Sequence, residues 1–214
     1  MNVEPHLFWI TSRAAGGAAL LASSASVALG LMISAKGSGA NKRDLRALHE
    51  ALSLTALAMV ALHGAALLGD AYLRPGLTGI TVPFAGSYRP LWTGLGIVAG
   101  YGLAALGLTY YCRDRIGAVR WRRIHRLTGL FWLLAVLHTI RAGSDAAQLW
   151  FLILSGALVV PAALLLLLRW LERLEGDGQA SGPALDPRTS SRARSLEPFG
   201  TQRESAERFS ATQR

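Results

Sequence analysis

The chain has 214 residues, of which 51% are hydrophobic and 16% are charged, whereas an ordinary soluble domain has about 25% charged residues. This composition argues against a soluble enzyme, and the net charge of +9 does not indicate a nucleic-acid binder, because the basic residues stand in short runs between long apolar stretches. The single cysteine, Cys112, excludes an internal disulfide, a Cys-x-x-Cys redox pair and a thiolate zinc cluster.

Five apolar stretches are long enough, at about 20 residues, to cross a bilayer core of roughly 30 Å. They cover residues 14–35, 47–69, 91–112, 124–140 and 147–168. The sequence therefore predicts an all-α fold, a polytopic membrane bundle of five transmembrane helices. Residues 1–13 are expected to form an external N-terminal segment, and residues 14–170 the transmembrane domain.

Residues 171–214 are predicted to form a cytoplasmic tail. From about residue 176 the tail is rich in Gly, Ser, Pro, Arg and Glu and has no apolar period, so it is expected to be disordered. Its length and composition do not suit a nucleotide-binding domain, and no strand-like segment precedes a Gly-x-Gly-x-x-Gly motif. We therefore expect no FAD or NAD(P) site in this chain.

The basic residues predict the orientation, because cytoplasmic loops carry more Lys and Arg than external loops. Segments 36–46 and 113–126, together with Arg169 and Arg173, hold 12 basic residues. The opposite side holds four, which are Arg13, Arg74, Arg89 and Arg141. The expected location is the cytoplasmic membrane, as a multi-pass protein with its N-terminus outside and its C-terminus inside.

Four of the five histidines lie in the apolar stretches, where ionisable residues are costly and usually functional. His49 and His63 are 14 residues apart, which is about 21 Å along a helix and within about 40° of one face. His125 and His138 are 13 residues apart, and an ideal helix would rotate them about 140° from each other. Tilt, a bulge near Gly129 or different directions of approach must absorb that difference.

The second and fourth stretches are separated by two crossings, so they run parallel. His49 is then level with His125 on the inner side, and His63 is level with His138 on the outer side. Two histidines at one depth can supply both axial ligands of a haem iron, and the lack of a Cys-x-x-Cys-His motif indicates non-covalent haem b. The sequence thus predicts two haem b groups, with these four histidines as iron ligands and no catalytic residue in the protein chain.

Two alternatives of other classes stay open. The histidines could line a path for a metal ion or a proton, but such a path would want Asp, Glu or Met beside them, and only Glu50 qualifies within the stretches. The chain could also be a purely structural partner subunit.

Cationic side chains near the outer level are candidate partners for the anionic haem propionates. Arg89 and Arg141 fit this role, because basic residues are scarce on that side and Arg141 follows His138 by one helical turn. Glycines in the third stretch are interpreted as close helix packing, with room for a porphyrin edge as the alternative. They are Gly94, Gly96, Gly100 and Gly102.

Three segments resemble a known family. They are LHEALSLTALAMVALHG (48–64), VPFAGSYRPLWTGLG (82–96) and RWRRIHRLTGLFWLLAVLHTIRAGSD (120–145). Over about residues 7–170 the chain resembles the ferric reductase-like transmembrane domain, a superfamily of ferric reductases, NADPH oxidase membrane domains and the haem-binding membrane subunit of methionine sulfoxide reductase systems. It is most similar to bacterial stand-alone members.

The resemblance implies an oxidoreductase membrane subunit in which His49, His63, His125 and His138 match the haem-ligating positions. Such a subunit passes electrons across the membrane lipid through two bis-histidine haems. The eukaryotic relatives carry a fused flavin and NAD(P)H module that this chain does not contain. We therefore expect a separate flavoprotein or membrane quinol as donor and an external acceptor such as ferric iron, oxygen or a periplasmic partner, with no nucleic-acid partner.

Overall fold

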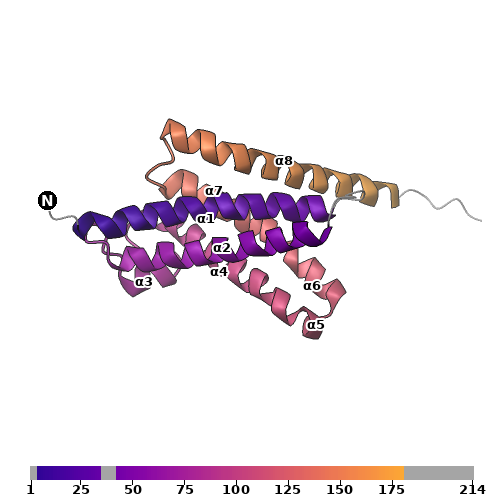
Figure 1. The fold of residues 1–214 in the computed structure, drawn as a ribbon, viewed down its shortest axis with the longest axis horizontal. Coiled ribbons are helices and arrows are strands. Elements are labelled where there is room, and N and C mark those ends of the chain that lie inside the picture. Colours follow the sequence, from indigo (N-terminus) through magenta and orange to yellow (C-terminus); the bar gives the residue numbers. More distant parts are fainter. Residues whose placement is uncertain (1–3, 35–41, 181–214) are drawn as a thin grey trace, which may run out of the picture. The chain divides into compact units, whose positions relative to one another are not determined.

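The computed structural model describes residues 4–34 and 42–180, and these residues form helices and no strand (Figure 1). The elements in chain order are α1 (Glu4–Ser34), α2 (Lys42–Leu68), α3 (Gly76–Thr81), α4 (Pro90–Leu108), the 3-10 turn η1 (Thr109–Cys112), α5 (Arg113–Ile116), α6 (Ala118–His125), α7 (Thr128–Ala142) and α8 (Leu149–Ala180). The predicted all-α class is confirmed.

Four helical segments of the described residues are long and apolar enough to cross a membrane. They are His6–Ser34, Arg43–Leu68, Pro90–Ile116 and Leu149–Glu175. The fourth expected stretch, residues 124–140, is instead divided between the end of α6 and the 15 residues of α7. At 1.5 Å per residue α7 is about 22 Å long, which is shorter than a bilayer core. The structure thus has four candidate spans among its described residues, and a fifth crossing by α6 and α7 together stays a prediction.

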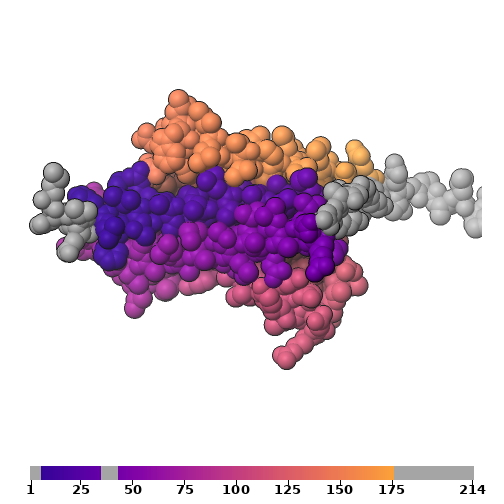
Figure 2. Space-filling model, in the orientation of Figure 1, coloured from indigo at the N-terminus to yellow at the C-terminus, as the bar shows by residue number. Residues whose placement is uncertain are grey.

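Two helix pairs make up most of the packing. α1 packs against α2 and α4 against α7, and α1 also touches α7. Figure 2 shows α1 (indigo) and α2 (purple) in contact along the visible face. Small residues are buried on both members of the first pair, where they let the two backbones approach closely. These residues are Ala15, Ala19, Ala22, Ser23, Ala56 and Ala66.

A tryptophan lies at the centre of the apolar core. The Trp132 side chain has no exposed surface and packs with Leu20, Val136, Phe151 and Ala162. Its indole nitrogen donates a hydrogen bond of 3.1 Å to the hydroxyl of Ser24, so the polar end of the ring is satisfied as burial requires. Residues from α1, α7 and α8 thus share one core, which holds α7 next to α1.

The outward faces of these helices are apolar, as a lipid environment requires. The exposed large hydrophobic side chains of α8 before Trp170 are Leu149, Trp150, Leu152, Ile153, Leu154, Val160, Leu164, Leu167 and Leu168. Such a continuous apolar surface is not compatible with exposure to water. The structure supports a multi-pass membrane protein.

Helices extend beyond two boundaries expected from the sequence. α1 begins at Glu4 and includes the exposed His6, so it covers most of residues 1–13, whose external position stays a prediction. Residues 176–180, expected to be disordered, continue α8, and the rest of the predicted disordered tail lies outside the described residues.

Candidate functional site

The four histidines of the apolar stretches lie in two pairs. The ring centroids of His49 and His125 are 6.4 Å apart with an interplanar angle of 85°. The ring centroids of His63 and His138 are also 6.4 Å apart, at 71°. These are the two pairs that the parallel arrangement of the second and fourth stretches predicts.

The separation within each pair suits two ligands of one metal ion. Two imidazoles bound on opposite sides of a metal, each at about 2 Å, have ring centroids roughly 6 Å apart. The separation of 6.4 Å in each pair is compatible with two imidazole ligands of one ion.

Hydrogen bonds assign the protons on three of the rings. The Nδ1 atom of His49 lies 2.9 Å from the carbonyl oxygen of Ser26, and the Nδ1 atom of His63 lies 2.8 Å from that of Ser12. The Nδ1 atom of His138 lies 2.9 Å from the carbonyl oxygen of Trp92. A carbonyl oxygen can only accept, so Nδ1 carries the proton and the Nε2 lone pair is left for a metal.

A glycine makes room for each of these rings. A Cβ atom on Gly16 or Gly30 would lie 3.1 Å from the ring of His63 or His49, and one on Gly96 would lie 2.5 Å from the ring of His138. In all three cases the glycine stands four residues after the residue whose carbonyl accepts the hydrogen bond. One helical turn without a side chain thus exposes the carbonyl oxygen to the histidine.

The serines and glycines of α1 were not among the residues that the histidine pattern singled out. Ser12 and Ser26, like Gly16 and Gly30, are 14 residues apart, which is the interval between His49 and His63 on the facing helix. That shared interval is a signal in the sequence that could have identified them. Serine and glycine are ordinary residues of a membrane helix, so the histidine pattern alone does not single them out.

His125 differs from the other three histidines. Its Nδ1 atom is buried and has no partner with hydrogen-bond geometry, although the main chain of Leu106 lies near the ring. Four residues after Leu106 stands Tyr110 in place of a glycine. The His125 ring instead stacks on Trp121, with centroids 4.8 Å apart at an angle of 22°.

A break between α6 and α7 resolves the rotational mismatch expected for His125 and His138. His125 is the last residue of α6, Arg126 and Leu127 form a turn, and α7 begins at Thr128. Because the two histidines belong to different helices, the angle of an ideal helix does not apply to them. The turn that absorbs the rotational difference lies at Arg126 and Leu127, just before Gly129, near which the sequence allowed for a bulge.

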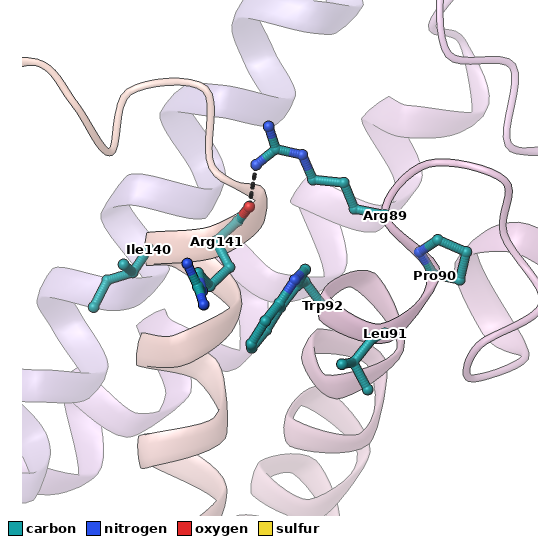
Figure 3. A pocket seen from close by; sticks show the side chains of 6 residues that line it. All are labelled: Arg89, Pro90, Leu91, Trp92, Ile140 and Arg141. Atoms are coloured by element: carbon teal, nitrogen blue, oxygen red, sulfur yellow. Dashed lines mark hydrogen bonds between the residues drawn. The ribbon is translucent and has the colours of Figure 1, made fainter.

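The two arginines expected near the outer pair lie together at an open pocket. Figure 3 shows Arg89, Pro90, Leu91, Trp92, Ile140 and Arg141 around it. The Arg89 guanidinium donates to the carbonyl oxygen of Arg141, and the Arg141 guanidinium lies 4.7 Å from the centroid of the Trp92 ring. Both cations thus line one pocket together with Trp92, the residue that also binds His138 through its carbonyl oxygen.

Other residues singled out in the sequence have structural roles. The hydroxyl of Tyr111 donates to the carboxylate of Glu50 at 3.1 Å. Phe131 fills the space left by Gly102, and Phe84 fills that left by Gly94. These contacts favour the interpretation of the glycines of α4 as packing positions.

The family is decided by a comparison with family models. Residues 15–136 match the model of the ferric reductase like transmembrane component. This chain belongs to that family. No curated protein and no solved structure gives a significant match.

The matched region of this ferric reductase-like chain contains most of the geometry described above. It includes His49, His63 and His125 and ends two residues before His138. Ser12 precedes it, although Ser12 contacts His63. The family resemblance expected from the sequence is confirmed, and family membership supports a membrane redox function.

Proposed function

We propose that this chain is a membrane b-type cytochrome that transfers electrons across the cytoplasmic membrane through two bis-histidine haems. The observation that carries the proposal is the geometry of the two histidine pairs. Each pair has a centroid separation of 6.4 Å, and three of the four rings are held at Nδ1 by a carbonyl oxygen with Nε2 left free.

The number of ligands favours haem over a bare metal ion. In the part of the chain that the structure describes, no group of three or more His, Cys, Asp or Glu side chains could hold a metal. A protein-bound zinc ion usually has at least three protein ligands, whereas a haem iron takes four nitrogens from the porphyrin and needs only two from the protein. Two isolated pairs of histidines fit the second requirement.

The chain's own residues would position the cofactor. Haem would supply the one-electron redox chemistry. α2 carries one ligand for each haem, and α6 and α7 carry the opposite ligands. The pairs are about 21 Å apart along α2. Arg89 and Arg141 line one pocket with Trp92, whose carbonyl oxygen binds His138, and there their charges would balance the propionates of that haem.

The loops predict the orientation, and the family resemblance implies the partners. With the basic segments in the cytoplasm, the His49–His125 pair faces inward and receives electrons from a separate flavoprotein or from membrane quinol. The His63–His138 pair faces outward and delivers them to an external acceptor. In this arrangement α6 and α7 together complete the fifth crossing, and the C-terminus is inside.

Haem quantification tests the proposal directly. The full chain, purified in detergent, should contain close to two equivalents of haem b per polypeptide and show the visible spectrum of six-coordinate iron. His49→Ala combined with His63→Ala should abolish both equivalents, while His6→Ala, the matched control outside the pairs, should retain them. A wild-type chain that folds and contains no haem would overturn the proposal in favour of the ion or proton path.

A further inference from the structure

Two serines of α1 contact two histidines of α2 in the same manner. The hydroxyl oxygen of Ser12 lies 3.0 Å from Nδ1 of His63 and donates to the main-chain carbonyl of His63 at 3.3 Å. The hydroxyl oxygen of Ser26 lies 3.0 Å from Nδ1 of His49 and donates to the carbonyl of His49 at 3.4 Å. We call each arrangement a serine clamp, because one hydroxyl accepts from the ring and donates to the backbone of the same histidine.

The clamps differ from ordinary buried serines of the same helix. Ser23 and Ser24 donate to the carbonyl of Leu20 within α1, which is how a hydroxyl usually satisfies itself in an apolar helix. Ser12 and Ser26 are equally buried, at 3% and 5% exposure, but their hydroxyls reach across to α2. Their role is thus specific to the two histidine positions.

Each clamp adds a second acceptor to a ring that a carbonyl already holds. The Nδ1 proton of His63 faces both the hydroxyl and the carbonyl oxygen of Ser12, and that of His49 faces both groups of Ser26. Acceptors at the remote nitrogen fix the ring orientation and make the ligating nitrogen more basic. A more basic ligand stabilises ferric iron over ferrous iron and lowers the potential.

We propose that Ser12 and Ser26 are positioning residues that set the reduction potentials of the two haems separately, Ser12 through His63 and Ser26 through His49. This inference rests on the proposed function. It also assigns α1 a role in tuning both haems although α1 contributes no ligand.

The two clamps are not identical in strength. The hydroxyl of Ser26 lies 2.7 Å from that of Ser53, and Ser53 donates to the carbonyl of His49 at 2.7 Å. Ser53 therefore still fixes the main chain of His49 when Ser26 is replaced, so the orientation of the His49 ring changes less. We expect Ser12→Ala to have the larger effect.

The test is a spectroscopic redox titration of the full chain with both haems bound. Loss of a partner at the remote nitrogen typically weakens metal binding by about tenfold or more. If that loss falls on the ferric state, Ser12→Ala raises the potential of one haem by about 59 mV, the equivalent of tenfold for one electron. Ser26→Ala should raise the potential of the other haem by less, and each variant should leave the second haem unchanged.

The matched control is Ser23→Ala, which removes a buried hydroxyl of α1 that does not contact a histidine. Ser12→Thr and Ser26→Thr should restore the wild-type potentials, because threonine keeps the hydroxyl. If Ser12→Ala instead releases one haem, the retained absorption of the other shows that the chain is folded, and that selective loss supports the proposal.

Two results would overturn the inference. The first is a wild-type chain with two haems whose potentials neither alanine variant moves beyond the Ser23→Ala control, and this result leaves the proposed function intact. The second is an equal shift of both potentials by either variant, which would indicate a general change in packing. A wild-type chain without haem would overturn the proposed function and this inference together.

Discussion

The proton on Nδ1 decides which nitrogen of a histidine remains for a metal ion. In His49, His63 and His138 a main-chain carbonyl holds that proton, so Nε2 is free on all three rings. His6, by contrast, is exposed and belongs to neither pair.

The ligand pairs make a prediction about spectra. His49→Ala and His125→Ala should remove the same haem component, and His63→Ala and His138→Ala should remove the other. The reason is that the two rings within each pair lie close together, with centroids 6.4 Å apart. Low-temperature absorption spectra and haem content of the four variants check this. Loss of one component by both His49→Ala and His138→Ala would contradict the pairing.

The glycine facing His138 should not tolerate a methyl group. In Gly96→Ala the new Cβ would lie 2.5 Å from the ring, so the ring must move, and overpacking of this kind costs about 1–3 kcal/mol. We expect loss of the His63–His138 haem, measured by haem content, and a smaller effect in Gly16→Ala and Gly30→Ala, where the distance is 3.1 Å.

Gly64→Ala is the control for the glycine series. Nothing lies within 4 Å of a Cβ at this position of α2, and alanine favours a helix over glycine by about 1 kcal/mol. This variant should keep both haems. Equal haem loss in Gly64→Ala and Gly96→Ala would show that any added methyl destabilises the helices.

The sequence predicted the histidines of the site but not their supports. Ionisable residues in apolar stretches are conspicuous because they are costly there. The serines and glycines of α1 are ordinary residues of a membrane helix, and only their contacts with α2 give them a role. Arg89 and Arg141 were predicted from charge and from the spacing of Arg141 to His138, and the structure places both at one pocket with Trp92.

At the level of helices, the break between α6 and α7 sets His125 apart. A continuous helix through residues 124–140 would have turned His125 away from the direction of His138. The turn at Arg126 and Leu127 frees His125 to face His49. This freedom leaves His125 without the carbonyl partner that the other three histidines have.

We therefore expect stacking on Trp121, rather than a hydrogen bond, to hold the His125 ring in place. The two rings stack at 4.8 Å, and an aromatic pair contributes about 0.5–1.5 kcal/mol beyond its burial. Trp121→Ala should weaken the binding of His125 to iron by up to about tenfold. Electron paramagnetic resonance should show high-spin iron for one haem only.

Trp150→Ala serves as the comparison for Trp121→Ala, because Trp150 is 58% exposed and lies on α8. It should leave both haems low-spin. If Trp121→Ala also leaves both haems low-spin, stacking does not hold His125 in place.

The helices themselves were predictable to different degrees. Long apolar runs gave the bodies of α1, α2, α4 and α8 because hydropathy determines which segments cross a membrane. The start of α1 at Glu4 and the division of α6 from α7 were not visible, since helix ends depend on capping and tertiary contacts that a hydropathy pattern does not contain.

For the whole molecule, we expect that NADPH cannot reduce the chain directly. The described residues form helices without a strand, and dinucleotide-binding folds are built on a parallel sheet. Pure chain with its haems in liposomes should not be reduced by NADPH, whereas dithionite should reduce both haems. External ferric chelate should then reoxidise them, and His63→Ala should block this step.

Reduction by NADPH with pure protein would show that the chain needs no separate donor. The corresponding control adds a flavoprotein reductase together with NADPH, which should reduce the haem of the His49–His125 pair first if that pair faces the cytoplasm.

Because the interval of 14 residues occurs in both α1 and α2, the number of residues between Ser12 and Ser26 matters as much as their identity. Ser12 and Ser26 meet His63 and His49 only because both helices advance by the same distance between their contacts. One extra residue between the serines would rotate one of them by about 100° and move it about 1.5 Å. A single insertion near Leu20 is therefore expected to break one of the two serine–histidine contacts and to leave the other in place, without replacing any side chain.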